Sequence, residues 1–457
     1  MAINPKIFKA YDARALYPSE INEEAARAVA RAFCFLLKPK RIVIGRDARK
    51  SSESLQNAMT DTFTSMGVDV CDLGAVPTPL VLYAVAKKGF GGGIIVSASH
   101  STSEYAGIKL IKHPNLQMCI PGDMEKIKQL ALNPVMSNES EANKIQEKKG
   151  RIEKINILQE YVDELCQKFQ GVKNLKVVVD YGNGMGSITA SPVFKKLRLE
   201  IIPMYQEIDM SFPNHTANPM DVSTLEEIRK KVVDEKADLG VAFDGDADRA
   251  ICIDDTGEII YADIMMALLI PFELKGRSEK KVYYDIRSSR AVQDAIKENN
   301  AKGIMLRAGN PFYKIKLTEE GGVFGGEVTG HMFFQDHYNI DDGLYVAMKV
   351  MNAMSQDKKK LSEHVKSLMK YFPSHELRFK VENADEIIER VKTQFLDGEV
   401  NTIDGVRVDY PDWWFSLRKS NTEPVLKLMI EANSKQKLDE MQEKLTGMIK
   451  QSGLIKE

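Results

Sequence analysis

The sequence has no long hydrophobic run. Its longest apolar stretch, from Ile264 to Phe272, is far shorter than the roughly 20 residues that a membrane-spanning helix needs. The chain also opens without the charged and then apolar segment that is typical of an export signal. We therefore expect a soluble, cytoplasmic protein with no membrane partner.

The chain also has few cysteines and almost no net charge. The five cysteines are odd in number, widely spaced and set among apolar residues, so the sequence offers neither a disulfide framework nor a CxxC metal site. The 63 lysines and arginines nearly balance the 65 aspartates and glutamates, and the net charge of −2 gives no sign of a nucleic-acid-binding surface. We expect buried, reduced thiols and no nucleic-acid partner.

The length of 457 residues exceeds what one hydrophobic core usually supports. Helical and strand patterns alternate in three successive rounds, with buried strands such as 176–180 and 239–243, and a fourth region has two amphipathic helices around further strands. We therefore expect an α/β protein with three similar α/β domains with mixed sheets and a smaller C-terminal α+β domain. The expected domains are residues 1–150, 151–257, 258–371 and 372–457.

Three aspartates alternate along one loop directly after a buried strand. Asp244, Asp246 and Asp248 can point several carboxylates at one hard cation, and such oxygen ligands suit Mg²⁺. An EF-hand is a poor alternative, because Arg249 stands where that loop needs glycine and a strand precedes it. A solvated acidic turn stays open as the second alternative, although crowded carboxylates repel one another without a cation. The pattern favours a metal site.

A possible nucleophile follows the strand 94–96. The segment Ser97-Ala-Ser-His100 would expose Ser99 at the carboxyl end of a sheet, with His100 and Lys109 nearby. Serines are common in loops, so this pattern alone is weak. The chain has no Gly-x-x-x-x-Gly-Lys-Ser/Thr phosphate loop. A serine nucleophile, a metal loop and no nucleotide motif together favour phosphoryl transfer without ATP.

Three other loops carry polar groups or glycines. The spacing in Gly182-Asn-Gly-Met-Gly186 differs from that of a dinucleotide-binding loop and favours a tight strand-to-helix turn. Residues 327–331 offer a carboxylate, a hydroxyl and an imidazole, a mixture that sugar hydroxyls need. Residues 418–422 offer a guanidinium, hydroxyls and backbone amides that could hold an anion.

Taken together, these motifs resemble those of the α-D-phosphohexomutase superfamily, in the same order across nearly the whole chain. The matching segments are 8–14 (FKAYDAR), 45–49 (GRDAR) with Ser51 and Ser52, 97–100 (SASH), 244–249 (DGDADR), 326–331 (GEVTGH) and 418–422 (RKSNT). The opening segment looks like the phosphomannomutase/phosphoglucomutase branch. The resemblance implies four domains around a central cleft. It also implies an enzyme that interconverts hexose 1-phosphate and hexose 6-phosphate, of mannose and/or glucose, through a phosphoserine and a hexose 1,6-bisphosphate.

The resemblance also implies roles for single residues. Ser99 would be phosphorylated, and Arg418 with its neighbours would grip the phosphate that does not react. The implied catalytic residues are Ser99, His100, Lys109, Arg14 and Arg249. The implied metal ligands are Ser99, Asp244, Asp246 and Asp248. The implied substrate-binding residues are Tyr11, Arg287, Asn310, Glu327, Thr329, His331, Arg418, Ser420, Asn421 and Thr422. Mg²⁺ would be the cofactor, glucose 1,6-bisphosphate or mannose 1,6-bisphosphate the activator, and the protein a monomer or weak homodimer that acts on hexose phosphates.

The chain departs from the family pattern at several positions. Ser101-Thr102 stands where relatives usually carry Asn-Pro, Arg287 where they often carry lysine, and Asn310 where they often carry histidine. Arginine effectively never deprotonates and asparagine does not titrate, so the sequence leaves the general base open. Phosphoglucosamine mutase, a metal-dependent sugar phosphatase and a non-catalytic phosphosugar-binding relative stay open as alternatives.

Overall fold

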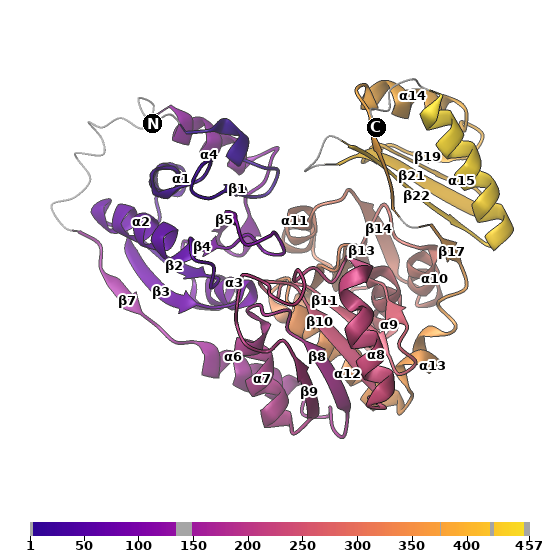
Figure 1. The fold of residues 1–457 in the computed structure, drawn as a ribbon, viewed down its shortest axis with the longest axis horizontal. Helices are drawn as coiled ribbons and strands as arrows, with labels where there is room; N and C mark the ends of the chain where they lie inside the picture. The colour runs from indigo at the N-terminus through magenta and orange to yellow at the C-terminus, as the bar shows by residue number, and fades with distance from the viewer. Residues whose placement is uncertain (1–2, 134–148, 375, 421–424, 452–457) are drawn as a thin grey trace.

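The computed structural model describes residues 3–133, 149–374, 376–420 and 425–451. Within them the chain forms four domains, each built around its own β-sheet (Figure 1). The first domain lies at the left of the figure and the fourth at the upper right. This confirms the expected fold class of three α/β domains with mixed sheets and a smaller C-terminal α+β domain.

The first domain has a mixed sheet in the order β1-β5-β4-β2-β3-β7, with β6 paired to β5. Strands β4, β2, β3 and β7 run parallel to one another, whereas β5 is antiparallel to both β4 and β1. Its elements are η1 (Pro5–Ile7), β1 (Ala13–Leu16), α1 (Glu23–Leu37), β2 (Arg41–Arg46), α2 (Ser52–Ser65), β3 (Asp69–Ala75), α3 (Thr78–Lys88), β4 (Gly92–Val96), β5 (Tyr105–Lys112), β6 (Leu116–Gln117), α4 (Asp123–Leu132) and β7 (Ile152–Lys154).

The second domain has a sheet in the order β12-β11-β10-β8-β9. Its strands β8 and β10 have the bounds that the sequence predicts, and Gly182, at φ +53°, turns the chain from β8 toward α7 as expected. The elements are α6 (Leu158–Lys168), β8 (Lys176–Asp180), α7 (Gly186–Leu197), β9 (Glu200–Met204), η2 (Val222–Leu225), α8 (Glu226–Asp234), β10 (Leu239–Phe243), β11 (Ala250–Asp254) and β12 (Ile259–Ile260).

The third domain has a four-stranded sheet in the order β14-β13-β15-β16. Strands β14, β13 and β15 are parallel, and β16 returns antiparallel to β15. The elements are α9 (Ala262–Leu274), β13 (Lys281–Asp285), α10 (Arg290–Glu298), β14 (Lys302–Leu306), α11 (Asn310–Glu320), β15 (Phe324–Gly326), β16 (Met332–Phe334), η3 (Gln335–His337), α12 (Gly343–Asp357) and α13 (Leu361–Val365).

The fourth domain has an antiparallel sheet in the order β17-β22-β21-β20-β19, with β18 also paired to β22. Figure 1 shows α14 and α15 packed beside it. The elements are β17 (Phe372–Pro373), β18 (Leu377–Lys380), α14 (Ala384–Thr393), β19 (Glu399–Asn401), β20 (Val406–Asp409), β21 (Trp413–Lys419), β22 (Val425–Ala432) and α15 (Lys435–Lys450).

Two short strands cross the expected domain boundaries. Strand β7 begins after residue 150 yet pairs with β3 of the first sheet, and β12 begins after residue 257 yet pairs with β11 of the second sheet. The polar, Lys/Glu-rich composition of segment 133–154 is typical of an exposed linker or a solvated helix, and 134–148 lies outside the described residues. Its last three residues extend a sheet, although all three are exposed. The sheets of the first and second domains therefore extend a few residues further than the sequence indicates.

One hydrophobic core runs through the first three domains. It joins residues such as Val81 of α3, Val179 of β8 and Met348 of α12. The rest of the first domain has a core of its own that includes Phe33 and Met59, and the fourth domain has a separate core that includes Phe415 and Leu445. All five cysteines are buried free thiols, as expected. Across the described ranges, no helix combines the length and the apolar character that a membrane span requires.

Two arginines join the third and fourth domains reciprocally. Arg407 of the fourth domain donates to the carbonyls of Ile286 (2.6 Å) and Ser288 (3.1 Å) in the third. Arg290 of the third domain donates to the carbonyls of Pro411 (3.0 Å), Tyr410 and Trp413 in the fourth. The guanidinium of Arg407 also lies 3.8 Å from the centre of the Trp414 ring. This joint holds the fourth domain against the loop that follows β13.

Arg407 also pairs with the half-buried Asp409 at 2.7 Å. We expect Arg407→Met to lower the free energy of unfolding by about 3–5 kcal/mol, because Asp409 loses this partner and two buried carbonyls lose their donor. Trp413 and Trp414, the only tryptophans of the chain, lie at this joint, so urea denaturation followed by tryptophan fluorescence measures the effect. The control is Lys435→Met, which removes an exposed ion pair with Asp439 and should cost no more than about 0.5 kcal/mol. Equal losses in the two variants would contradict the importance of the joint.

Candidate active site

Ser99 lies in the loop after β4 and has an unusual backbone conformation. Its φ of +52° is in the left-handed region, which residues other than glycine seldom adopt. The buried Arg49 holds this loop by donating to the carbonyls of Ser99 (2.9 Å) and Ser101 (2.6 Å). Arg49 is in turn paired with Asp47 at 3.1 Å. The sequence motif at 45–49 contained this support, but nothing in the pattern assigned it a role.

The Ser99 hydroxyl joins residues of two domains. Its Oγ donates to Asp244 Oδ2 (3.0 Å), lies 3.2 Å from His100 Nδ1 and accepts from Arg249 Nη2 (3.3 Å). Burial and the neighbouring guanidinium of Arg249 hold the pKa of His100 well below its ordinary value, so the imidazole is neutral at neutral pH. Gly245 permits this close approach, because a Cβ there would lie only 2.5 Å from the Ser99 carbonyl oxygen.

The three aspartates among the predicted metal ligands converge in the turn between β10 and β11. One carboxylate oxygen from each of Asp244, Asp246 and Asp248 lies within 4.8 Å of the others. All three side chains are at most 1% exposed, so the alternative of a solvated acidic turn is wrong. Lys109 Nζ lies 2.7 Å from an oxygen of both Asp246 and Asp248, and Arg249 pairs with Asp244 at 2.8 Å. Lys109 thus contacts the metal loop.

The pKa values of these aspartates differ because their neighbours differ. Burial and the charge of Asp248 raise the pKa of Asp244 to about 7. Burial opposes ionisation of Asp248 as well, but attraction to Lys109 and His331 lowers its pKa to about 2. Burial likewise opposes ionisation of Asp246, and Lys109 nevertheless holds its pKa below the usual value. The three carboxylates face Lys109, Arg249 and His331, but His331 is also shared with Asp341 at 3.0 Å. A further cation would reduce the repulsion among the crowded carboxylates.

Two carboxylate oxygens in the loop fit a divalent cation. Asp246 Oδ1 and Asp248 Oδ1 are buried, and neither accepts a hydrogen bond from the residues that the structure describes. Buried polar atoms are almost always satisfied, so such atoms call for an unseen partner. Hard oxygen ligands of this kind suit Mg²⁺. The donor set therefore fits the predicted ion.

The loop after β13 meets the Glu327 loop through Arg287. The guanidinium of Arg287 lies 2.5 Å from Asp285 and 3.1 Å from Glu327, and Glu327 Oε1 also accepts from the backbone N–H of Gly309 (2.9 Å). Burial disfavours the charged guanidinium, but Asp285 and Glu327 raise the pKa of Arg287 above its ordinary value. Arg287 therefore stays charged and holds Glu327 in place, which excludes it as a general base.

His331 and Asn310 converge on Asp341, which the sequence did not single out. His331 Nδ1 lies 3.0 Å from Asp341 Oδ2, and Asn310 Nδ2 donates to the same oxygen at 3.3 Å. Lys314, also missed, lies 2.5 Å from the other oxygen. The Oγ1 of Thr329 is buried and has no hydrogen-bond partner within the described part of the chain. Of the predicted sugar-binding residues of the third domain, His331 and Asn310 therefore share the acceptor Asp341, whereas Arg287 and Glu327 pair with each other.

The segment 8–14 of the first domain contacts both Ser101 and the third domain. Arg14 pairs with Asp12 at 2.6 Å and donates from Nη1 to Ser101 Oγ at 3.0 Å. Ser101, one of the departures from the family pattern, is therefore an acceptor for Arg14. The Tyr11 hydroxyl donates to the Ala308 carbonyl at 3.1 Å. Burial, and next the charge of Glu327, raise the pKa of Tyr11 well above its ordinary value.

Arg418 comes from the fourth domain and is 3% exposed. Its Nε lies 2.8 Å from Asp404 Oδ2, which also accepts from the backbone N–H of Ala308 (3.1 Å). Its Nη2 is buried and finds no hydrogen-bond partner among the described residues. Ser420 follows, and its backbone N–H donates to the Val425 carbonyl at 2.9 Å. Asn421 and Thr422 lie outside the described residues. No sequence pattern marks Asp404, because its contacts form only on folding.

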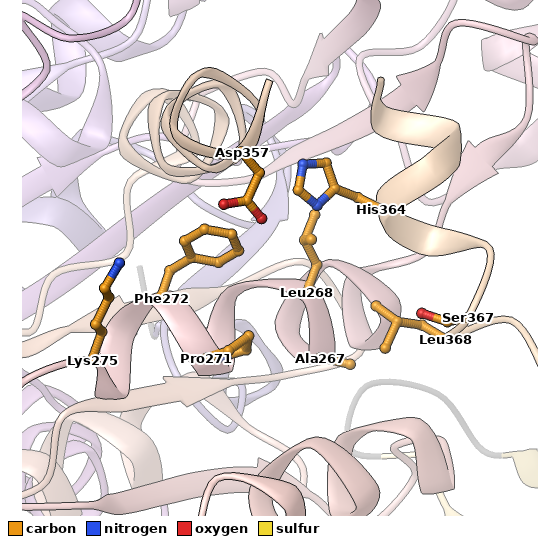
Figure 2. Close-up of a pocket in the computed structure, with 9 residues that line it drawn as sticks. All are labelled: Ala267, Leu268, Pro271, Phe272, Lys275, Asp357, His364, Ser367 and Leu368. Carbon is orange, nitrogen blue, oxygen red and sulfur yellow. The ribbon is translucent and has the colours of Figure 1, made fainter. Parts of the chain in front are cut away.

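A pocket of about 340 Å³ lies elsewhere, on the third domain between α9, the end of α12 and α13 (Figure 2). The residues that line it are Ala267, Leu268, Pro271, Phe272, Lys275, Asp357, His364, Ser367 and Leu368. None of these lining residues is among the predicted site residues.

Comparison with known proteins agrees with this arrangement. Models of phosphoglucomutase/phosphomannomutase alpha/beta/alpha domains I, II and III match residues 5–136, 159–257 and 261–372, and the model of the C-terminal domain matches 376–448. A phosphomannomutase/phosphoglucomutase of Pseudomonas syringae is 31% identical over 95% of this chain and 93% of its own length. A phosphomannomutase of Escherichia coli is 33% identical over 93% of this chain and 94% of its own length.

A solved structure supports the same assignment. The crystal structure of a phosphoglucomutase/phosphomannomutase family protein from Burkholderia thailandensis has a TM-score of 0.88 and 30% identity, and the match covers 99% of this chain and 100% of that one. Four domain models in the expected order, relatives matched along nearly their whole length and a shared overall fold agree with one another. The chain belongs to the phosphoglucomutase/phosphomannomutase family of the α-D-phosphohexomutase superfamily.

Proposed function

We propose that the protein is a phosphosugar mutase that interconverts hexose 1-phosphate and hexose 6-phosphate, of mannose and/or glucose. Ser99 would carry the phosphoryl group, and a hexose 1,6-bisphosphate would be the intermediate. One observation carries the proposal: the Ser99 hydroxyl lies within hydrogen-bond distance of Asp244, His100 and Arg249, beside carboxylates with free buried oxygens. The names of the relatives support the same activity.

Two half-reactions would share this site. In the first, the bond between phosphorus and Ser99 Oγ breaks while the free sugar hydroxyl bonds to phosphorus; the sugar hydroxyl gives up its proton, and the released Ser99 Oγ takes one up to become a hydroxyl. In the second, Ser99 Oγ bonds to the other phosphorus of the reoriented bisphosphate and gives up its proton, while the bond between that phosphorus and the sugar oxygen breaks and the sugar oxygen takes up a proton. Catalysis of such transfers depends mainly on positioning and on stabilisation of charge. Ser99 is 4% exposed, which favours transfer to a bound sugar over transfer to water.

The residues around Ser99 supply positioning and charge. Asp244, Asp246 and Asp248 would hold Mg²⁺ together with an oxygen of the phosphorylated Ser99, and when bound the ion would neutralise charge on the transferring phosphoryl group. Arg249 contacts Ser99 Oγ directly, and Arg14 lies next to the same loop through Ser101. Both guanidiniums can stabilise negative charge on the phosphoryl oxygens.

Binding of the sugar and of its second phosphate would come from the third and fourth domains. Glu327, held by Arg287, and Thr329, with its unpartnered buried hydroxyl, can bind sugar hydroxyls. Arg418 Nη2, which has no hydrogen-bond partner in the described part of the chain, can donate to the phosphate that does not react. The bisphosphate activator, the state as a monomer or weak homodimer and the cytoplasmic location stay predictions from the sequence.

Ser99→Ala should abolish mutase turnover, because Ser97 and Ser101 are held elsewhere by their own contacts and cannot replace a correctly positioned nucleophile. Intact-mass measurement after treatment with glucose 1,6-bisphosphate provides the test: the parent protein should gain one phosphate and the variant none. Ser101→Ala is the control and should still be phosphorylated. A phosphorylated, active Ser99→Ala protein would show that another residue is the nucleophile.

Arg418→Ala should lower kcat/KM by about 10- to 100-fold, because a charge-assisted hydrogen bond to phosphate is worth roughly 1.5–3 kcal/mol. The effect should include a raised KM, since the distal phosphate would lose its donor. Steady-state kinetics with a hexose 1-phosphate measure both constants. Lys435 is exposed in the same domain, so Lys435→Ala should leave both constants unchanged. If Arg418→Ala also leaves kcat and KM unchanged, the fourth domain does not take part in substrate binding.

Glucose 1-phosphate and mannose 1-phosphate should both be substrates, with kcat/KM values within about two orders of magnitude of each other. The two sugars differ at the 2-hydroxyl, and we expect Glu327 and Thr329 to bind other hydroxyls. Parallel assays with these two phosphates and glucosamine 1-phosphate measure the preference. A strong preference for the glucosamine phosphate would favour phosphoglucosamine mutase, and release of inorganic phosphate in place of an isomer would favour a phosphatase.

A further inference from the structure

A residue of the first domain contacts the metal loop of the second domain and has no role in the proposal above. We propose that Thr78 is a positioning residue for the Mg²⁺ site. It holds one oxygen of Asp246 and so leaves the other oxygen available to the cation. This inference rests on the proposed metal site, and it adds a residue that acts through a ligand and does not itself touch the ion.

Thr78 is the first residue of α3 and is 2% exposed. Its backbone N–H donates to the carbonyl of Asp246 at 3.0 Å, and its Oγ1 donates to Asp246 Oδ2 at 2.5 Å. Thr78 therefore contacts Asp246 twice: its main chain binds the Asp246 backbone, and its side chain binds the Asp246 carboxylate. Because α3 begins here, the partial positive charge of its N-terminus also favours the ionised carboxylate.

The two oxygens of Asp246 have different surroundings. Oδ2 accepts from both the Thr78 hydroxyl and the Lys109 ammonium (2.7 Å), whereas Oδ1 is buried and accepts nothing from the described residues. Two donors from different directions fix the rotation of the carboxylate, which would otherwise exchange its oxygens. Lys109 is shared with Asp248, while the Thr78 hydroxyl donates to Asp246. Thr78 therefore provides the contact that is specific to this ligand.

The third domain holds the same loop from another direction. The backbone N–H of Gly343, at the start of α12, donates to the carbonyl of Ala247 at 3.1 Å. The metal loop of the second domain is thus held by the first residue of a helix from each neighbouring domain. Partners that orient metal ligands typically contribute 10- to 100-fold to metal affinity. The Thr78 hydroxyl should have an effect of this size.

The test compares Thr78→Val, which keeps the shape and removes the hydroxyl, with Thr78→Ser, which keeps the hydroxyl. Isothermal titration calorimetry with MgCl₂ on the dephosphorylated full chain measures the affinity, and thermal unfolding in EDTA measures the fold without metal. We expect Thr78→Val to weaken Mg²⁺ binding by 10- to 100-fold and Thr78→Ser to stay within about threefold of the parent. If the valine variant does not fold, Thr78→Ala replaces it.

Two outcomes would contradict the role of Thr78 without contradicting the metal site. One is an unchanged Mg²⁺ affinity in Thr78→Val, and the other is an equal loss of Mg²⁺ affinity in Thr78→Ser. Asp246→Asn separates this result from a failure of the metal site, because it removes the charge of a proposed ligand and should abolish measurable binding. If the parent and Asp246→Asn bind Mg²⁺ equally, the metal site itself is wrong, and the role of Thr78 is wrong with it.

Discussion

Three carboxylates buried on one short hairpin loop set the constraint on which the rest of the molecule depends. A buried charge costs several kcal/mol unless it is paired, so Asp244, Asp246 and Asp248 need compensation from nearby. Arg249 comes from the loop itself, but Lys109 comes from another domain. Such a loop is stable only where domains meet. The position of the site at a junction is therefore a consequence of its charge.

The sequence predicted those parts of the site that are contiguous along the chain. Strands β8 and β10 are continuous apolar runs followed by polar loops, and this pattern depends little on tertiary context. Asp341 and Asp404 were missed because each acts through contacts between distant segments, which leave no local pattern. Strand β7 was missed for a different reason. All three of its residues are exposed, so the sequence there lacks the alternation of apolar and polar residues that indicates a strand.

Two residues that depart from the family pattern, Ser101 and Arg287, make contacts within the site. Ser101 accepts a hydrogen bond from Arg14, and Arg287 spans two carboxylates, Asp285 and Glu327. A forked guanidinium can contact both at once, which the single ammonium of lysine does less rigidly. From the sequence, Arg287 raised a question about the missing base. In the structure the charge of Arg287 orients Glu327. This contact favours a working substrate site over the alternative of a non-catalytic phosphosugar-binding relative.

The continuous core of the first three domains has a consequence for cooperativity. Domains that share apolar side chains cannot separate without exposing them to water, so this part of the chain should open and close as one thermodynamic unit. The fourth domain has a core of its own and is joined mainly through polar contacts such as those of Arg290 and Arg407. We therefore expect the shared core to keep Ser99 and the aspartates in fixed relative positions, and the fourth domain, which brings Arg418, to separate more easily.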